Sequence, residues 1–261
     1  MADTMELSLQ GRRVNYIEQG TGDYVLLLHG WGANIELFRP LIGVLSGRYT
    51  VLAPDLPGFG NSEEPETPWC VDDYVDFVID FLAQFRCRKV ILLGHSYGGR
   101  IIIKLANRQG LPFSIAKIIL VDSAGILPKR SAKSKLRQRC FKLCKGVLSL
   151  PPVAKLCPDA LENFRKRMGS ADYAAASPIM RQTLVRSVNE DLQPLLPGIK
   201  PPTLLVWGRE DTATPLSDGE CMEQLIPGSG LVVLDHAGHY AFLDQQYTFH
   251  KVMCSFLEIG E

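Results

Sequence analysis

The chain has 261 residues, of which 46% are apolar, and its 28 basic and 28 acidic side chains give a formal net charge of zero. This size and composition suit one large domain with a sizeable core, and the neutral balance gives no reason to expect a nucleic-acid partner. No fixed repeat, no run of about 18 apolar residues and no apolar signal segment is present, which argues against a membrane-spanning or secreted protein.

The seven cysteines are odd in number and scattered along the chain. That usage is typical of free thiols in a reducing compartment, so we expect a cytoplasmic protein. Cys140 and Cys144 are spaced to share one helix face, but no CxxC pair or nearby histidine completes a zinc set. We therefore expect no metal site.

In chain order, two short strands at 7–9 and 14–17 should form an antiparallel pair that ends at the turn residues Gly20-Thr21-Gly22. Later strands are continuous apolar runs, as strands covered on both faces require; these are 24–28, 50–53, 89–93, 116–121, 203–207 and 231–234. Apolar residues at helical spacing predict helices between them, at 35–46, 72–85, 98–108 and 242–257. This alternation predicts a mostly parallel sheet with helices on both faces.

About eighty residues separate the strand ending at Val121 from the strand starting at Thr203, far more than an ordinary connection. We interpret residues 126–197 as an inserted helical lid, and residues 1–125 and 198–261 as the core. An apolar stripe predicts one amphipathic helix in the lid, formed by Leu136, Cys140, Cys144, Val147 and Leu148. Prolines should divide the rest into short helices; they are Pro151, Pro152, Pro158 and Pro197.

The first part of this insertion is strongly basic. Residues 126–170 contain twelve basic and two acidic side chains, a net charge of +10. A solvated helix face explains such a pattern. An anionic or acyl ligand, or contact with a membrane surface, is the alternative reading.

A G-x-S-x-G pentapeptide follows the apolar run at 90–93 and precedes a helical pattern. In that setting Ser96 should lie on a sharp bend between strand and helix, with its hydroxyl pointing outward. Gly94 and Gly98 would let the strand and the helix pack closely. Ser96 is therefore the candidate nucleophile.

A serine hydroxyl needs a general base to take its proton and a carboxylate to orient that base. His239 follows the last strand and is the preferred base, with His236 as the alternative. Asp211 follows the strand at 203–207 and is the preferred acid; the rival is Asp122, which we interpret as a loop-stabilising residue. The order Ser96, Asp211, His239 is the one this triad takes on an α/β sheet.

Two backbone N–H groups should stabilise the negative charge that develops on the substrate oxygen. Tyr97, at the start of a helix, supplies the first, and Trp31 supplies the second. His29 and Gly30 belong to the same glycine-containing loop as Trp31 and should support it. The turn-rich segment 55–62 should be a structural loop at the pocket mouth.

Five motifs, in this order, resemble those of the α/β-hydrolase superfamily, specifically its small lid-bearing esterases and meta-cleavage hydrolases. They are HGWG at 29–32, DLPGFGNS at 55–62, GHSYGG at 94–99, WGREDTATP at 207–215 and GHY at 238–240. The resemblance implies eight strands, the second antiparallel, and a lid after the sixth. Relatives that open epoxides or displace halide have a carboxylate where this chain has Ser96, and iminopeptidase-like relatives need acidic lid groups, so both activities are disfavoured.

The expected activity is hydrolysis of a small or medium carboxylic ester through an acyl-enzyme on Ser96, with no cofactor. Cleavage of a carbon–carbon bond in a vinylogous diketone is the first alternative. The second alternative is a ligand-binding or regulatory protein that keeps the triad but turns substrate over too slowly to matter. The expected partner is a small ester or acyl molecule, and the sequence allows either a monomer or a homodimer.

Overall fold

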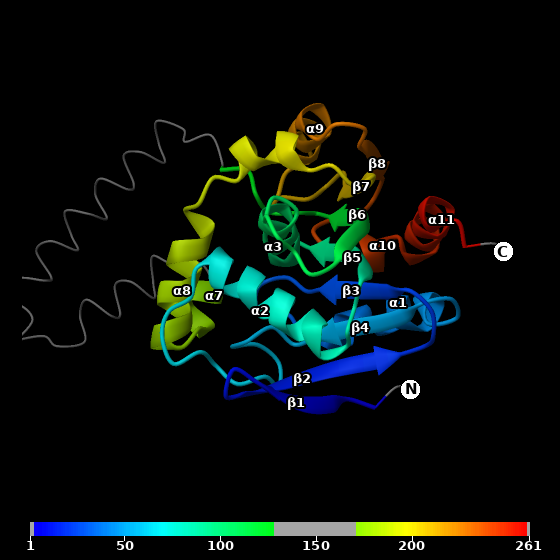
Figure 1. The fold of residues 1–261 in the computed structure, drawn as a ribbon. Coiled ribbons are helices and arrows are strands. Elements are labelled where there is room, and N and C mark those ends of the chain that lie inside the picture. The colour runs from blue at the N-terminus through cyan, green and yellow to red at the C-terminus, as the bar shows by residue number, and fades with distance from the viewer. Residues whose placement is uncertain (1–2, 128–170, 260–261) are drawn as a thin grey trace, which may run out of the picture.

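The computed structural model describes residues 3–127 and 171–259. Within these ranges the chain forms an eight-stranded sheet of order β1-β2-β4-β3-β5-β6-β7-β8, with helices on both faces (Figure 1). The strands are β1 Met5–Leu9, β2 Arg12–Gln19, β3 Tyr24–Leu28, β4 Thr50–Pro54, β5 Lys89–His95, β6 Ser114–Val121, β7 Thr203–Gly208 and β8 Gly230–Leu234. The predicted fold class is confirmed.

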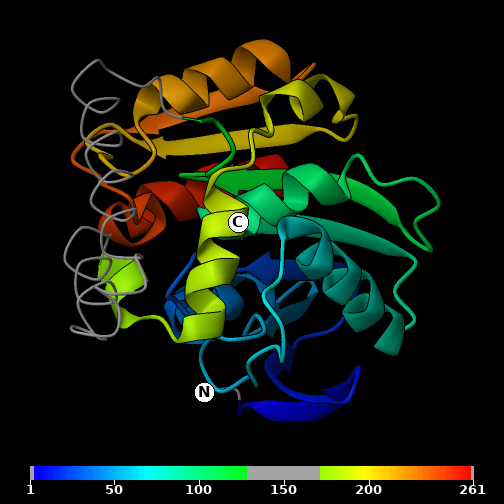
Figure 2. The same ribbon diagram turned by 90° about the vertical axis from the view of Figure 1, so that its left-hand side faces the viewer.

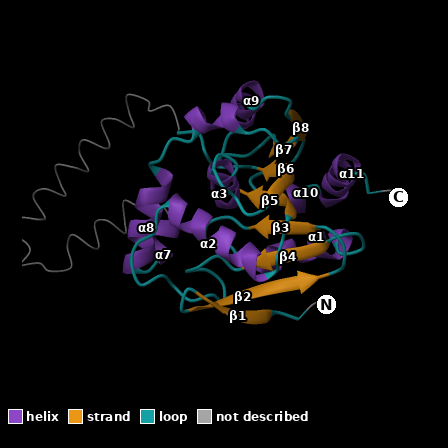
Figure 3. Cartoon of the chain, viewed as in Figure 1, coloured by secondary structure: helices purple, strands orange, loops and turns teal. Residues whose placement is uncertain are grey.

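Only β2 runs against the other strands, which are drawn in orange in Figure 3. β2 pairs antiparallel with both β1 and β4, and each later pair of neighbours is parallel. The carboxyl ends of the parallel strands therefore meet at one edge of the sheet, where loops can bring distant side chains together.

Alternation along the strands divides the core into two layers, because successive side chains point to opposite faces. In β5, Val90 and Leu92 join one cluster, and Ile91 and Leu93 join the other. The first cluster is covered by α2 Val71–Gln84, α3 Tyr97–Leu105 and α9 Leu216–Leu225, and the second by η1 Ile35–Phe38, α1 Arg39–Leu45, α10 Ala241–Asp244 and α11 Gln246–Leu257. Each large apolar side chain buried there contributes about 1.5–3 kcal/mol, which fixes the helices more firmly than helix propensity does.

Two predicted helices prove to be divided. The expected helix at 35–46 begins as the 3₁₀ helix η1, capped by the Asn34 side chain, and continues as α1 with Pro40 in its first turn. The expected helix at 242–257 breaks at Gln245, whose φ of −122° and ψ of 48° are not helical. Helix α9 was not predicted.

The described part of the predicted insertion contains α7 Ala171–Ala175, α8 Pro178–Val188 and the 3₁₀ helix η2 Gln193–Gly198. Short helices are as expected here, although Pro197 lies inside η2 rather than ending a helix. The predicted amphipathic helix, the prolines at 151, 152 and 158, and almost all of the basic segment lie outside the described residues. The lid boundaries stay a prediction.

Helix α8 is docked on the core by buried polar contacts, on the side of the molecule that faces the viewer in Figure 2. Trp69 N donates to Thr183 Oγ1 at 3.0 Å, and the hydroxyls of Tyr97 and Ser187 hydrogen-bond at 2.9 Å. Buried donors without acceptors are costly, so these pairs fix where α8 sits. None of the helices in the described ranges combines the length and the hydropathy needed to cross a membrane.

Candidate active site

Ser96 occupies the bend between β5 and α3, with φ 50° and ψ −107°. A non-glycine residue in such a region costs about 1–3 kcal/mol, so its surroundings must hold it there. Ser96 N donates to the carbonyl of Val121 at 3.0 Å, and Ala124 N donates to the carbonyl of Ser96 at 3.0 Å. The bend that the pentapeptide predicts is present, and the end of β6 holds it on both sides.

The glycines beside Ser96 are required by space, as the sequence predicts. A Cβ on Gly98 would overlap the carbonyl oxygen of Leu28 in β3, and a Cβ on Gly94 would lie 2.7 Å from the carbonyl carbon of Gly98. Real Cβ atoms do not approach backbone atoms so closely. Helix α3 is therefore pressed against the sheet directly behind the serine.

The three predicted triad residues lie in one hydrogen-bonded line. His239 Nε2 is 2.9 Å from Ser96 Oγ, and His239 Nδ1 is 2.8 Å from Asp211 Oδ2. Because a carboxylate only accepts hydrogen bonds, Nδ1 carries the proton and donates to Asp211, which leaves Nε2 to accept from the serine hydroxyl. This is the tautomer that a general base for Ser96 needs.

Asp211 is held rigidly by the loop that follows β7. Its Oδ1 accepts from the N–H groups of Ala213 at 2.7 Å and Thr214 at 3.0 Å. Burial tends to raise the pKa of Asp211, but the hydrogen bonds from His239 and Thr214 outweigh burial and hold that pKa below its ordinary value. Asp211 is thus charged at neutral pH and can stabilise a protonated His239.

The rival residues do not occupy these positions. His236 is exposed, and its Nδ1 lies 3.6 Å from Oε1 of its exposed neighbour Glu210 rather than near Ser96. Asp122 is fully buried, and its two carboxylate oxygens accept from the backbone N–H groups of Gly208 at 2.8 Å and Ala241 at 2.9 Å. Asp122 therefore stabilises loops, as interpreted, although through distant backbone rather than a local turn.

The loop at 29–32 is anchored by His29. Its Nδ1–H donates to the carbonyl of Gly30 at 2.8 Å, and its Nε2 accepts from Leu56 N at 2.9 Å. Burial lowers the pKa of His29, which keeps the ring neutral, as this pair of bonds requires. In the described part of the chain no acceptor takes the backbone N–H of Trp31 or Tyr97. Both groups are free there to act as oxyanion donors, and that role stays a prediction.

The segment 55–62 is the structural loop that its turn residues indicate. Asp55 Oδ1 accepts from Ile35 N at 2.8 Å, and Asp55 Oδ2 accepts from Asn61 N at 2.8 Å. Gly60 has φ +54°, and a Cβ there would overlap the Asp55 carboxylate. The loop is thus folded around one buried carboxylate and supports the start of η1.

Sequence reasoning missed two residues that contact the candidate triad. Thr214 Oγ1 lies 2.7 Å from Asp211 Oδ2 and 3.3 Å from His239 Nδ1. His95 Nε2–H donates to the carbonyl of His239 at 2.7 Å, and burial lowers the pKa of His95 to about 3. The hydroxyl three residues after the candidate acid was the available signal for Thr214, whereas His95 carries no signal beyond its place in the pentapeptide.

Aromatic side chains cluster between the serine bend and α8. The Trp31 ring meets Phe59 at 4.8 Å and Tyr97 at 5.2 Å between ring centroids, both edge-on, and Tyr97 meets Tyr74 at 5.4 Å. Such edge-to-face pairs pack apolar surface with defined geometry. The surroundings of Ser96 on this side are therefore largely apolar.

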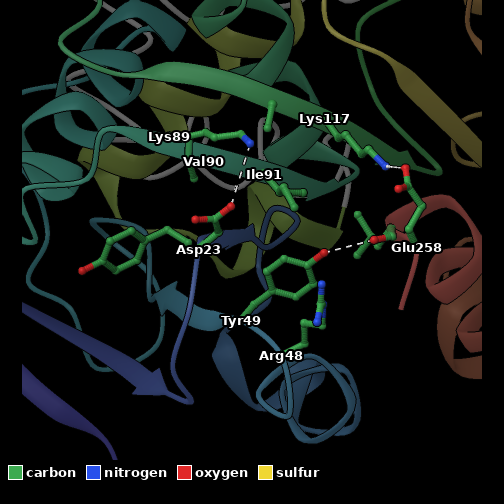
Figure 4. Close-up of a pocket in the computed structure, with 11 residues that line it drawn as sticks. Asp23, Arg48, Tyr49, Lys89, Val90, Ile91, Lys117 and Glu258 are labelled. Atoms are coloured by element: carbon green, nitrogen blue, oxygen red, sulfur yellow. Dashed lines mark hydrogen bonds and ion pairs between the residues drawn. The ribbon is translucent and has the colours of Figure 1, made fainter. Parts of the chain in front are cut away.

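A cavity of about 400 Å³ opens at the other edge of the sheet, at the amino ends of the parallel strands (Figure 4). Four of its charged side chains form two pairs, Lys89 with Asp23 at 3.9 Å and Lys117 with Glu258 at 2.7 Å. Among the described residues that line this cavity there is no serine, cysteine or histidine. The described residues also contain no group of three or more His, Cys, Asp or Glu arranged to hold a metal ion.

Comparison with known proteins places this arrangement in a family. The model of the alpha/beta hydrolase family matches residues 25–249. The chain is 29% identical to the pimeloyl-[acyl-carrier protein] methyl ester esterase of Neisseria meningitidis, covering 90% of this chain and 93% of that one. It is 26% identical to the 2-hydroxy-6-oxo-2,4-heptadienoate hydrolase of Pseudomonas putida, covering 95% and 93%.

A solved structure of a membrane phospholipase A, described as a bacterial virulence factor, superposes with a TM-score of 0.76 at 27% identity. The match covers 98% of this chain and 86% of that chain. The sheet order, the serine bend and the family match agree. The chain belongs to the alpha/beta hydrolase family.

Proposed function

We propose that the protein is a serine hydrolase that cleaves small or medium carboxylic esters. The observation that carries the proposal is the hydrogen-bonded line from Ser96 through His239 to Asp211, with distances of 2.9 and 2.8 Å. A buried carboxylate, a correctly protonated imidazole and a serine hydroxyl in this order form the constellation for nucleophilic acyl transfer.

In the proposed reaction, Ser96 Oγ attacks the ester carbonyl while His239 Nε2 takes the serine proton. The imidazolium that forms is stabilised by Asp211, and His239 then gives its proton to the leaving alcohol. The acyl-enzyme is released by a water molecule that His239 activates in the same way. All the proton transfers are made by side chains of the chain, so the chemistry needs no cofactor.

The backbone N–H groups of Trp31 and Tyr97 are the proposed donors to the negatively charged oxygen of the tetrahedral intermediate. Tyr97 begins α3, so its N–H points out of the positive end of the helix dipole. Loss of one such donor raises the barrier by about 2.7–4 kcal/mol, which is enough to decide whether turnover is measurable. The aromatic side chains around Trp31 favour an apolar substrate group beside the reacting carbonyl.

Carbon–carbon bond hydrolysis of a vinylogous diketone is the second candidate. Its support is the similarity to the heptadienoate hydrolase over almost the whole chain. The two reactions share the nucleophile and the base and differ in the bond that breaks, so the line of three residues alone does not separate them.

Turnover of p-nitrophenyl esters of rising acyl chain length tests the proposal. We expect saturable hydrolysis that Ser96→Ala abolishes. Negligible turnover of every ester, with rapid turnover of a vinylogous diketone, would replace the first candidate by the second. A fluorophosphonate probe tests the remaining alternative: a native chain that neither labels at Ser96 nor turns over either substrate class is a binding or regulatory protein.

A further inference from the structure

The bend that follows β6 touches the loops of all three proposed catalytic residues. Val121 and Ala124 hold Ser96 from both sides, as described above. Asp122 lies between them in the left-handed region, with φ 45°, an unusual conformation for a residue with a side chain. The Thr214 hydroxyl lies 3.0 Å from the Asp122 carbonyl oxygen and 2.7 Å from Asp211 Oδ2, and its one proton is shared between these two acceptors. This bend is therefore tied both to the nucleophile and to the loop of the acid.

The side chain of Asp122 joins two loops that are far apart in sequence. Its Oδ1 accepts from the N–H of Gly208, whose own carbonyl accepts from Asp211 N at 3.2 Å. Its Oδ2 accepts from the N–H of Ala241, two residues after His239. One carboxylate thus bridges the start of the loop that carries Asp211, the acid loop, and the end of the loop that carries His239, the histidine loop. Its two oxygens fix the distance between these loops.

Burying this carboxylate costs the fold free energy. Asp122 is fully buried, and no ion pair among the described residues includes it. Burial raises the pKa of Asp122 to about 7, against the effect of the two N–H donors. A neutral side chain would fill this site at lower cost. Above this pKa the ionised carboxylate supplies what a neutral side chain cannot, two equivalent acceptors that face two donors from different loops.

We propose that Asp122 is a positioning residue, whose carboxylate fixes the acid loop against the histidine loop and so keeps His239 in line with Ser96 and Asp211. The inference depends on the proposed function only through its kinetic readout. Asp122 contacts backbone rather than the reacting groups, and it acts through the placement of His239.

Asp122→Asn is the informative substitution, because asparagine tolerates the left-handed backbone and keeps one of the two acceptors. Its amide N–H₂ then faces a backbone N–H, and one loop is released. We expect kcat for an ester to fall by on the order of 100-fold with KM unchanged, as for a misplaced catalytic group. The low-field proton resonance of His239 Nδ1–H should shift or broaden, and the thermal midpoint shows that the variant is folded.

Asp244→Asn is the matched control. Asp244 Oδ2 also accepts an N–H of the histidine loop, that of Gly238 at 2.8 Å, but from the exposed side. We expect wild-type kcat and an unchanged resonance. Ala241→Pro removes the donor instead of the acceptor, at the first position of α10 where proline is tolerated. It should reproduce the loss and serves as the test if Asp122→Asn does not fold.

The outcomes separate this inference from the proposed function. An active wild type whose Asp122→Asn variant keeps its kcat and its resonance overturns the positioning role and leaves the hydrolase proposal intact. Equal losses in Asp122→Asn and Asp244→Asn overturn it as well. The Asp122 contact would then matter no more than any other hydrogen bond to the loop that carries His239. If the wild type turns over no ester, the ester-hydrolase proposal fails, and the resonance alone still decides whether Asp122 places His239.

Discussion

The two edges of the parallel sheet both carry charged side chains, but in different surroundings. At the carboxyl edge, Asp122 and Asp211 are buried and each accepts several hydrogen bonds. At the amino edge, Lys89 and Asp23 face each other at 3.9 Å with side chains 59% and 67% exposed. Exposed pairs are screened by water and contribute little, whereas buried groups interact strongly and shift each other's pKa. We therefore expect reactivity at the carboxyl edge, and four predictions test this contrast.

The largest effect is expected at the nucleophile. Ser96→Ala removes the attacking oxygen and should lower kcat for any ester substrate by on the order of 10⁶. Measured pre-steady-state and steady-state turnover check this, and a fluorophosphonate probe should no longer label the chain. Turnover that persists within about tenfold of the wild type would mean that another group performs the attack.

A methyl group behind the serine should damage the fold. Gly98→Ala places a Cβ where the carbonyl oxygen of Leu28 lies, and we expect a loss of at least about 3 kcal/mol in the free energy of unfolding. Gly43→Ala is the control, because nothing lies within 4 Å of a Cβ at that position in α1. It should stabilise the protein by about 0.4–1 kcal/mol. Urea titrations compare the two, and similar values would refute the close packing of α3 on the sheet.

Acid should destabilise the carboxyl edge through His95. Its pKa is about 3 in the fold and 6.5 in the unfolded chain, so between these values the unfolded chain binds more protons. The contribution of His95 to stability is complete above pH 6.5 and is lost as the pH falls toward 3. His95→Gln keeps a donor for the carbonyl of His239 and does not titrate. The stability difference between wild type and variant should therefore shrink, or favour the variant, as the pH falls; a constant difference would contradict the assignment.

The smallest effect is expected at the amino edge. Lys89→Ala removes an exposed ion pair and should change the free energy of unfolding by less than about 0.5 kcal/mol. Ester turnover should match the wild type at every substrate concentration. A clear loss of activity would show that the two edges of the sheet are coupled.

Much of the architecture follows from local pattern. Continuous apolar runs give buried parallel strands, and glycines around Ser96 give the bend, because both depend on short stretches of sequence. Helix α9 was not predicted from the sequence, because its segment LSDGECMEQL contains a glycine and few apolar residues. Met222 is the one of these apolar residues that is fully buried. The break at Gln245 carries no proline or glycine to mark it.

The candidate triad is within reach of sequence reasoning, because each member lies within five residues of the end of a recognisable strand. The supporting contacts are not. Asp122 meets Gly208 and Ala241 across 86 and 119 residues of chain, and His95 meets His239 across 144. Only the folded sheet brings such groups together, and a single sequence has no short-range signal for them.

Tyr97 connects the bend at Ser96 to helix α8. Its backbone begins α3 beside Ser96, and its phenol hydroxyl is bonded to Ser187 in α8. A displacement of α8 would therefore pull on the residue adjacent to the nucleophile. Redesign of the helices above the site for bulkier substrates must preserve this tether or supply another, because a chimaera that loses it would alter turnover as well as substrate choice.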